Sequence, residues 1–251
     1  MILSYPDVKS VVVCGDIHGD FEALVYKITV QYQLSDTLII VAGDCGFGFE
    51  KKGYYEQIFN KIQKCLIAHN NWIVMVRGNH DNPSYFNGEN RITHKRWCTI
   101  PDYTVLMVCG HNILCVGGAI SIDRFLRKQE MLIRSEKELY WMDEAPFLNE
   151  DIFEVLKVND INIDAVITHT APSFCDLQTK SGLENWALYD DKLLEDCECE
   201  RSVMDAIVER LKCNNHNLKH WYYAHFHQSR RAFIDGVKYV MLDIMELQEL
   251  R

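Results

Sequence analysis

The chain alternates between short apolar runs and segments whose apolar residues recur at helical spacing. The short runs are rich in β-branched and aromatic residues, which predicts buried strands. We expect these strands at 11–14, 37–42, 72–76, 164–167 and 220–224. Between them, apolar residues three or four positions apart predict amphipathic helices. We expect these helices at 21–28, 55–66, 149–158 and 203–211. This alternation is typical of an α/β fold.

Two hairpins and one stretch without hydrophobic periodicity complete the predicted secondary structure. Residues 104–108 and 112–116 are two apolar runs joined through a short turn, and Asp235-Gly236 is a strong signal for a type I′ hairpin turn. Residues 173–190 show no periodicity, and we expect a long loop or a cap near the site. No repeat or linker interrupts the chain, so one domain over residues 1–251 is predicted.

Each of the five predicted strands is followed by side chains that can bind a metal. In chain order these are Asp16 and His18, then Asp44, then Asn79 with His80, then His169, then His225 and His227. The carboxyl ends of strands in an open α/β sheet lie along one edge, where ligands bind. The sequence therefore predicts a shared site at that edge.

The donor set indicates the chemistry of that site. Imidazoles, carboxylates and an amide oxygen suit Mn, Fe, Zn or Mg better than metals that prefer thiolates. The set is too large for one four-coordinate ion and fits two divalent or transition-metal ions that share a bridging carboxylate. A pair of ions polarises a phosphoryl oxygen, lowers the pKa of a water and stabilises the leaving oxygen.

Composition narrows the possible partners. The net charge of −10 makes binding to long nucleic acid unexpected, because such proteins usually carry a basic face. No apolar run is long enough to cross a bilayer, and the first residues do not resemble a signal peptide. The ten cysteines fall mainly in predicted strands and helices, which favours free thiols and a cytoplasmic location.

Five motifs together resemble those of the calcineurin-like metallophosphoesterases. They are Asp16-Ile17-His18, Gly43-Asp44, Gly78-Asn79-His80-Asp81, the lone His169 and His225-Phe226-His227, in the order found in that family. The resemblance implies a four-layer α/β/β/α sandwich of two mixed sheets flanked by helices. It also implies a dinuclear metal site at the carboxyl edge of the strands.

The resemblance further implies a role for each site residue. The first metal would take Asp16, His18, Asp44 and His227. The second would take Asp44, Asn79, His169 and His225, with Asp44 as the bridge. His80 would lie outside the metal shell and act as general acid on the leaving oxygen. A metal-bridging hydroxide would attack the phosphorus of a phosphomonoester or phosphodiester, either a small molecule or a phosphoprotein.

The sequence departs from the family's Ser/Thr protein phosphatases after the second strand. Phe47 stands where those enzymes carry the acid that orients the catalytic histidine, and Gly48 stands where they carry a phosphate-binding arginine. Protein-phosphatase activity is therefore in doubt. Our hypothesis is that Arg124 or Arg127 contacts phosphate instead. The alternative for each is a solvated helix face.

Two other functions fit the same motifs. One is a nuclease or cyclic-nucleotide phosphodiesterase. The other is a non-catalytic scaffold of the same fold, which we would expect to lack metal ligands or the catalytic histidine. All ligand positions and His80 are present here, which favours an enzyme. Substrate specificity is expected from 85–100, 123–147 and 173–195, and the sequence does not predict an oligomeric state.

Overall fold

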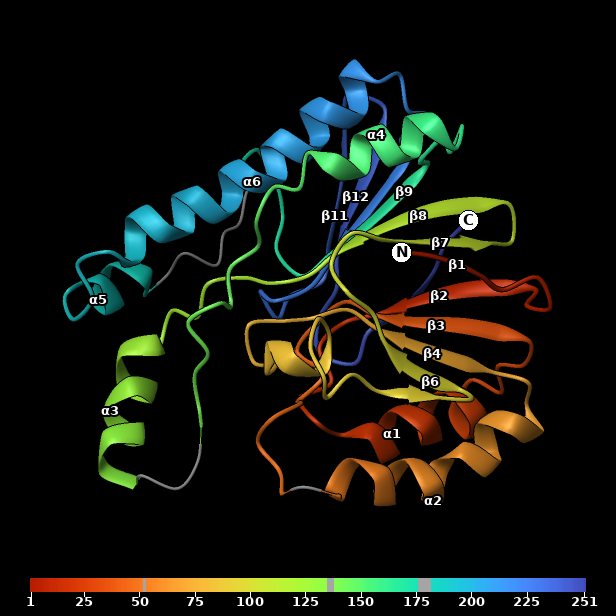
Figure 1. Cartoon of the computed structure of the whole chain (residues 1–251), viewed down its shortest axis with the longest axis horizontal. Coiled ribbons are helices and arrows are strands. Elements are labelled where there is room, and N and C mark those ends of the chain that lie inside the picture. Colours follow the sequence, from red (N-terminus) through yellow and green to blue (C-terminus); the bar gives the residue numbers. More distant parts are fainter. Residues whose placement is uncertain (52, 135–137, 176–181) are drawn as a thin grey trace.

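The predicted apolar runs form the inner strands of two mixed sheets that pack face to face (Figure 1). The computed structural model describes residues 1–51, 53–134, 138–175 and 182–251. Sheet A contains, in spatial order, β1 (Ile2–Ser4), β7 (Thr104–Val108), β8 (His111–Val116), β9 (Ala165–Thr168), β10 (His220–Tyr223), β12 (Val237–Met241) and β11 (Arg230–Ile234). Sheet B contains β13 (Leu247–Glu249), β2 (Ser10–Cys14), β3 (Thr37–Val41), β4 (Trp72–Met75), β6 (Trp97–Thr99) and β5 (Thr93–His94).

The strands that carry the motifs are parallel to their neighbours. In sheet B, β2, β3, β4 and β6 pair in parallel, and in sheet A, β8, β9, β10 and β12 do so. Antiparallel pairing is found where β7 meets β8, β11 meets β12, β13 meets β2 and β5 meets β6. Parallel pairing brings the carboxyl ends of the motif-bearing strands to a common edge in each sheet.

Helices cover the outer face of each sheet and complete four layers (Figure 1). Helices α1 (Phe21–Tyr26) and α2 (Tyr54–Ala68) lie against sheet B, and a π-helical turn (Lys27–Gln31) follows α1 directly. Helices α4 (Asp151–Val158) and α6 (Leu193–Cys213) lie against sheet A. The predicted α/β/β/α sandwich is confirmed.

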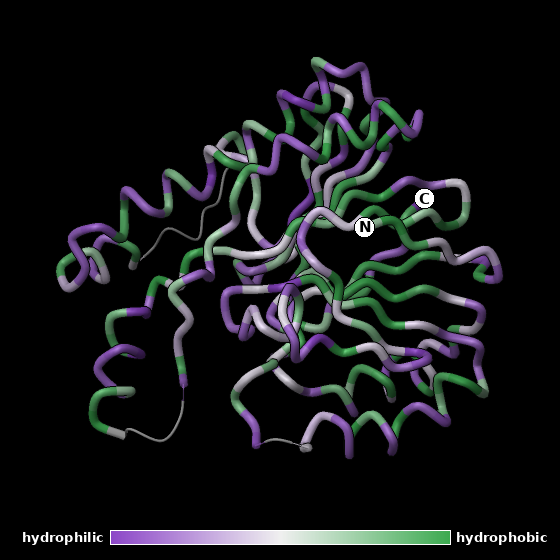
Figure 2. Tube along the Cα trace, viewed as in Figure 1, coloured by the Kyte–Doolittle hydropathy of each residue, from purple (hydrophilic) through white to green (hydrophobic). Residues whose placement is uncertain are grey.

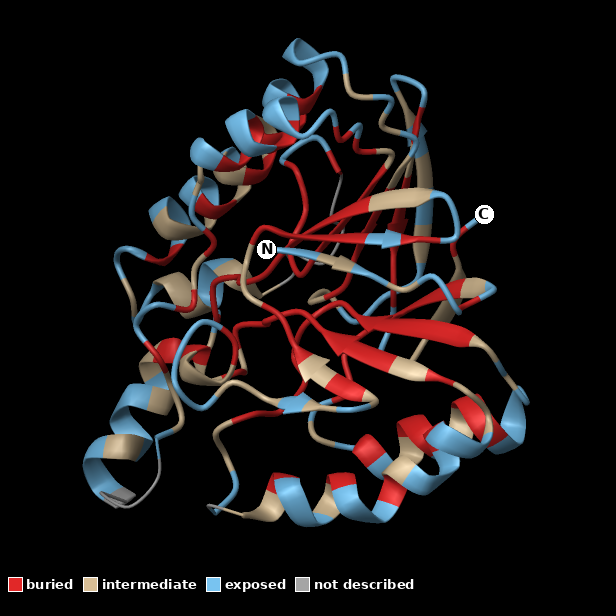
Figure 3. Cartoon of the chain, turned by 45° about the vertical axis from the view of Figure 1, so that its right-hand side comes forward, coloured by how far each residue is buried: buried red, intermediate tan, exposed pale blue. Residues whose placement is uncertain are grey.

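Three apolar clusters fill the three interfaces between these layers. One joins α4 and α6 to sheet A, the second lies between the two sheets, and the third joins sheet B to α1 and α2. Figure 2 shows the inner strands as hydrophobic segments, and Figure 3 shows that these inner strands are buried, while α1, α2, α4 and α6 each bury one side. Fully burying one aliphatic side chain contributes about 1.5–3 kcal/mol, so these clusters supply the main favourable term in folding.

Several short elements were not predicted from the sequence. They are β1, β5, β6, β13, a 3₁₀ turn (Pro83–Tyr85), α3 (Arg124–Arg134) and α5 (Leu183–Ala187). Strands of two or three residues carry no measurable periodicity. Helices α3 and α5 lie to one side of the sandwich (Figure 1). Of the expected loop or cap at 173–190, residues 176–181 lie outside the described part of the chain, and α5 forms part of the remainder.

The predicted hairpin turn is confirmed, because Asp235 and Gly236 have φ of 50° and 82°, the left-handed pair that a type I′ turn requires. The boundaries of the other predicted strands differ from the observed ones by no more than one or two residues, the usual uncertainty at element ends. None of the described helices combines the length and apolar character needed to span a bilayer.

We expect Ile207→Ala to lower the free energy of unfolding by about 2–5 kcal/mol, because its side chain is fully buried between α6 and sheet A and its loss leaves a cavity. Ile133→Ala is the control. Ile133 is 81% exposed in α3, so its replacement should change the free energy of unfolding by less than about 0.5 kcal/mol. Equilibrium unfolding in denaturant measures both, and equal losses would contradict this assignment of the core.

Candidate active site

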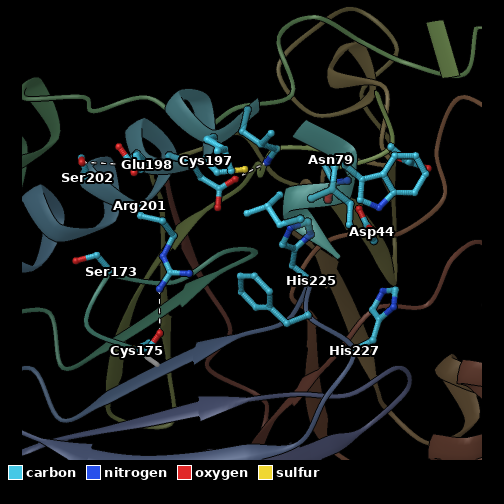
Figure 4. A pocket seen from close by; sticks show the side chains of 18 of the residues that line it. Asp44, Asn79, Ser173, Cys175, Cys197, Glu198, Arg201, Ser202, His225 and His227 are labelled. Carbon is cyan, nitrogen blue, oxygen red and sulfur yellow. Dashed lines mark hydrogen bonds between the residues drawn. The ribbon is translucent and has the colours of Figure 1, made fainter. Parts of the chain in front are cut away.

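The loops after five strands, three in sheet B and two in sheet A, converge at one edge of the sandwich. Asp16 follows β2, Asp44 follows β3 and Asn79 follows β4, while His169 and His225 follow β9 and β10. Figure 4 shows Asp44, Asn79, His225 and His227 close together at one end of a cavity. Side chains up to 211 residues apart in the sequence therefore meet at one site.

The first half of the site contains Asp16, His18, Asp44 and His227. One ligand atom from each of these residues lies within 4.8 Å of the others. His227 Nε2 is 2.9 Å from Asp16 Oδ2 and 3.2 Å from His18 Nε2. Both carboxylates are buried, while His18 and His227 are more exposed. These are the four residues that the resemblance assigned to the first metal.

The second half contains Asn79, His169 and His225 beside Asp44. His169 Nε2 lies 2.9 Å from Asn79 Oδ1 and 3.2 Å from Asp44 Oδ1. The ring centroid of His225 is 4.9 Å from that of His169. The structure thus brings together all seven residues expected to bind metal, with Asp44 shared between the two halves.

The donor atoms are arranged as a cation would require. His169 Nδ1 donates to the carbonyl oxygen of Ala42 at 2.7 Å, so the ring presents the lone pair of Nε2 to the oxygens of Asn79 and Asp44. Lone pairs that face one another at these distances repel unless a proton or a metal cation lies between them. Among the described residues, Asp16 Oδ2 is also one of few buried side-chain atoms without a well-formed hydrogen bond. The residues therefore fit a pair of bound cations.

The electrostatics of the site agree with this fit. Burial would raise the pKa of Asp44, but the neighbouring imidazoles of His169 and His80 outweigh burial and hold the pKa well below its usual range. Burial would lower the pKa of His169, yet Asp44 and Asp16 raise that pKa to about 9, so the two carboxylates favour a positive charge, a proton or a metal cation, at His169 Nε2. Burial, together with His169, lowers the pKa of His225 well below its usual value, so this ring is neutral and free to act as a ligand.

Four of the seven expected ligands adopt backbone conformations that side chains rarely take. The φ angles of His18, Asp44, His225 and His227 are 45°, 47°, 68° and 50°. Such conformations cost about 1–3 kcal/mol each and persist only where the surrounding structure enforces them. Strain of this kind concentrates at functional sites, which marks these loops as shaped for the positions of their side chains.

Two glycines give the site its close packing. A Cβ on Gly43 would lie 2.2 Å from His169 Nδ1, and a Cβ on Gly78 would lie 2.1 Å from the backbone nitrogen and Oδ1 of Asp44. No side chain fits at either position without displacing a ligand. The glycines of the Gly43-Asp44 and Gly78-Asn79 motifs are therefore explained by the approach of His169 and Asp44.

Asp81 holds two of the site loops together, a role that the sequence did not reveal. Its buried carboxylate accepts backbone hydrogen bonds from Gly46, Phe47 and Cys45 after β3, and from Gly78 after β4. Burial and the charge of Asp44 raise the pKa of Asp81 to about 6, against the effect of these four donors. The carboxylate thereby fixes the position of Asp44 relative to Asn79.

Ser121 and Glu144 orient the amide of Asn79. Asn79 Nδ2 donates to Ser121 Oγ at 2.8 Å, and Ser121 donates through Oγ to Glu144 Oε2 at 2.5 Å and through its backbone nitrogen to Glu144 Oε1 at 3.1 Å. All three side chains are buried. Because the nitrogen of the amide is occupied, its oxygen faces His169 and the metal position. Glu200 holds the residue after His169 in place, since it accepts from Thr170 Oγ1 and from the backbone of Ile120.

His80 lies at the rim of the site, beside the residues expected to bind metal. Its backbone nitrogen donates to Asp44 Oδ1 at 2.8 Å. Arg127 Nη2 contacts the ring, 2.8 Å from Nδ1 and 3.2 Å from Nε2. A guanidinium can only donate, so one ring nitrogen of His80 accepts from Arg127, and both ring nitrogens lie within reach of Nη2. Burial lowers the pKa of His80 and Arg127 adds to this, while Asp44 opposes it.

The two arginines singled out in the sequence have different surroundings. Arg127 is held by Asp123 at 2.8 Å and reaches His80 and a shallow hollow beside His18. Arg124 is directed away from the ligand cluster. Its buried guanidinium pairs with Asp190 and Asp196, each at 2.6 Å. The structure therefore brings Arg127, and not Arg124, to the site.

The structure also shows what replaces the acid and arginine at positions 47 and 48. Phe47 is fully buried among aromatic rings, with Tyr55 at 4.9 Å and Phe21 at 5.5 Å between ring centroids. A Cβ on Gly48 would lie 2.7 Å from the ring of Trp141. These positions are packed with apolar groups. Arg127 from α3, held by Asp123, the residue before that helix, contacts His80 instead.

We expect Ser121→Ala to weaken metal binding about 10- to 100-fold, because the amide of Asn79 loses the hydrogen bond that orients it. Calorimetric titration with Mn²⁺ measures the change. Ser202→Ala is the matched control, since Ser202 is exposed and donates only to the backbone of its own helix at Glu198. Equal affinities in the wild type and both variants would show that Ser121 does not position Asn79.

Comparison with known proteins places this site in a family. A fission-yeast (Schizosaccharomyces pombe) serine/threonine-protein phosphatase, ppe1, is 30% identical over 155 residues, which cover 53% of this chain and 50% of the relative. The Drosophila melanogaster serine/threonine-protein phosphatase 6 catalytic subunit is 28% identical over 124 residues, 44% of this chain and 40% of the relative. The chain spans about half the length of the curated relatives it matches.

Solved structures with low sequence identity were also found. The cold-active protein-tyrosine phosphatase of a Shewanella species is 16% identical, with a TM-score of 0.41, and the match covers 100% of this chain and 78% of that one. The phosphopantetheinyl hydrolase of Mycobacterium tuberculosis is 15% identical, with a TM-score of 0.40 and coverage of 98% and 95%. Residues 9–229, which include all five motifs, match the calcineurin-like phosphoesterases as a family. This chain belongs to the calcineurin-like phosphoesterase family.

Proposed function

We propose that this chain hydrolyses phosphoesters by means of two metal ions held between its two sheets. The observation that carries the proposal is the convergence of seven donor side chains, with Asp44 shared between two halves. Asp16, His18, Asp44 and His227 would hold one ion, and Asp44, Asn79, His169 and His225 the other. Bound there, Mn, Fe, Zn or Mg would polarise the phosphoryl group and lower the pKa of a coordinated water.

His80 and Arg127 act on the substrate beside the metal position. Because one ring nitrogen of His80 accepts from Arg127, the neutral ring carries its hydrogen on the other nitrogen, and that N–H can donate a hydrogen bond to the leaving oxygen. Arg127 carries further N–H groups beside His18 and His80, and these can contact a phosphate oxygen. Asp123 holds the guanidinium in place through its pair with Arg127 Nε.

The substrate in this proposal is a small phosphoester. The matched relatives are named as serine/threonine-protein phosphatases, but here the corresponding acid and arginine positions are occupied by Phe47 and Gly48. A net charge of −10 also gives little attraction for a polynucleotide. All ten cysteines are free, which supports a reducing compartment such as the cytoplasm. A complete ligand set and His80 argue against a scaffold.

The test of this proposal is hydrolysis of 4-nitrophenyl phosphate and bis(4-nitrophenyl) phosphate by the Mn²⁺-loaded protein. We expect activity on at least one ester, and we expect His80→Asn to lower kcat about 10²- to 10⁴-fold. Metal affinity should remain near that of the wild type, because His80 is not among the ligands. Lack of activity on both esters with each of the four metals would refute the proposed function.

The same assay separates the two arginines. Arg127→Ala should raise KM about tenfold, because a charge-assisted contact to phosphate is lost. Arg124→Ala should leave KM near the wild-type value and lower the melting temperature, because Asp190 and Asp196 lose their buried partner. An unchanged KM in Arg127→Ala would remove Arg127 from the phosphate site.

A further inference from the structure

A large cavity extends from the metal ligands toward α5 and α6. Its volume is about 870 Å³, and its lining begins at Asp44, Asn79, His225 and His227 (Figure 4). Cavities of about 300–1,000 Å³ are typical of small-molecule sites. Apolar side chains, among them Ile122, Leu183, Trp186 and Leu194, form an apolar wall of this cavity. An organic group attached to a phosphate at the metal site would extend along this wall.

Arg201 is the charged residue of the cavity with unused hydrogen-bonding capacity. It projects from α6 toward Cys175 (Figure 4). Its Nη2 donates to the backbone oxygens of Pro172 and of Cys175, the latter at 3.0 Å. Within the described part of the chain, the Nε–H and both Nη1–H groups have no acceptor, and Nε is buried. Because Nε is inaccessible, the Nη1 group carries the donors that a ligand can reach, and a half-buried guanidinium with two free donors favours an anionic partner.

The other charged groups near Arg201 are engaged elsewhere or face solvent. Glu200 accepts from Thr170 and Ile120, and Asp205 accepts from the backbone and hydroxyl of Ser173. Asp123 pairs with Arg127, and Glu198 is exposed. No carboxylate among the described residues forms an ion pair with Arg201. Burial lowers the pKa of Arg201, and Glu200 and Asp205 oppose this effect through space, but they leave its Nη1 donors to a ligand.

The guanidinium of Arg201 lies close to the expected metal site. Its guanidinium carbon lies 5.8 Å from the ring centroid of Phe226, and that centroid lies 4.8 Å from the ring of the expected ligand His225. One phenyl ring thus separates the guanidinium from the metal ligands. A group bound by Arg201 can belong to the same small molecule as the reacting phosphate.

We propose that the substrate is a small phosphoester with a second anionic group, a carboxylate or another phosphate, and that Arg201 binds this group. The proposal rests on the proposed function and narrows its substrate class. The reacting phosphate lies at the metal site, the organic part lies along the apolar wall, and the second anion accepts from the free Nη1 donors of Arg201. Arg201 is a specificity-determining residue and takes no part in bond cleavage.

Matched substrate pairs test this proposal. The Mn²⁺-loaded full chain is assayed with two pairs of esters. The first pair is 4-(phosphonooxy)benzoate and 4-(phosphonooxy)benzamide. The second pair is 3-(4-(phosphonooxy)phenyl)propanoate and the corresponding propanamide. For at least one pair we expect kcat/KM to favour the acid about tenfold or more, because a hydrogen-bonded ion pair is gained. In Arg201→Gln the ratio of acid to amide should fall to about one, and in Arg201→Lys to an intermediate value.

Arg210→Gln is the control, since Arg210 lies near the C-terminal end of α6 and pairs with exposed Glu150. It should keep the wild-type ratio. A wild-type ratio near one for both pairs would overturn the proposal, and so would an unchanged ratio in Arg201→Gln. If Arg201→Gln fails to fold, an unchanged ratio in Arg201→Lys would overturn it instead.

A measurement of ligand binding distinguishes failure of the Arg201 proposal from failure of the proposed hydrolase function. If the wild type hydrolyses none of the esters, the proposed function fails. Calorimetry with the non-hydrolysable pair 4-carboxybenzylphosphonate and its amide then still tests Arg201. Tighter binding of the acid that is lost in Arg201→Gln supports the anion site, and equal binding of the two overturns it.

Discussion

The burial of two carboxylates next to each other is the constraint on which the rest of the site depends. Asp16 and Asp44 are almost fully buried, and their ligand atoms lie within 4.8 Å. Removing two like charges from water is costly unless donors or cations surround them. Asp44 receives the backbone N–H of His80 and faces His169, and Asp16 receives the backbone N–H of His225. The fold must therefore deliver imidazoles from several loops to one place, and it does so by ending parallel strands of both sheets at the same edge.

A second set of buried acids keeps those loops in position. Asp81 joins the loops after β3 and β4 through four backbone hydrogen bonds. Glu144 acts through Ser121 on Asn79, and Glu200 acts through Thr170 beside His169. None of these groups is among the expected ligands. Their contribution is to reduce the freedom of the ligands, so that the strained backbone at positions such as His18 and Asp44 is retained.

The sequence predicted what is encoded locally. Buried parallel strands such as β3 appear as continuous apolar runs, and the polar residues that follow them formed recognisable motifs. The layer order followed from the resemblance. Short edge strands such as β5 and β13 escaped prediction because they contain too few residues to show a period. The supporting groups, Ser121, Glu144 and Arg201 among them, lie outside the motifs, and their partners are 23 or more residues away. Only tertiary packing reveals such pairs. Tertiary packing also explains why Arg124, expected from the sequence as a candidate phosphate contact, instead pairs with acids away from the site.

The strand order has a consequence for how the chain reaches this structure. Sheet A pairs β1, at residues 2–4, with β7, more than a hundred positions later, and sheet B pairs β2 with β13, at residues 247–249. Each sheet thus has an edge that closes only when distant parts of the polypeptide meet. Contacts of such high sequence separation slow folding, because the entropy of closing the intervening loop is lost before the contact is formed. During synthesis on the ribosome, β2 therefore remains without its outer neighbour until residues 247–249 have emerged.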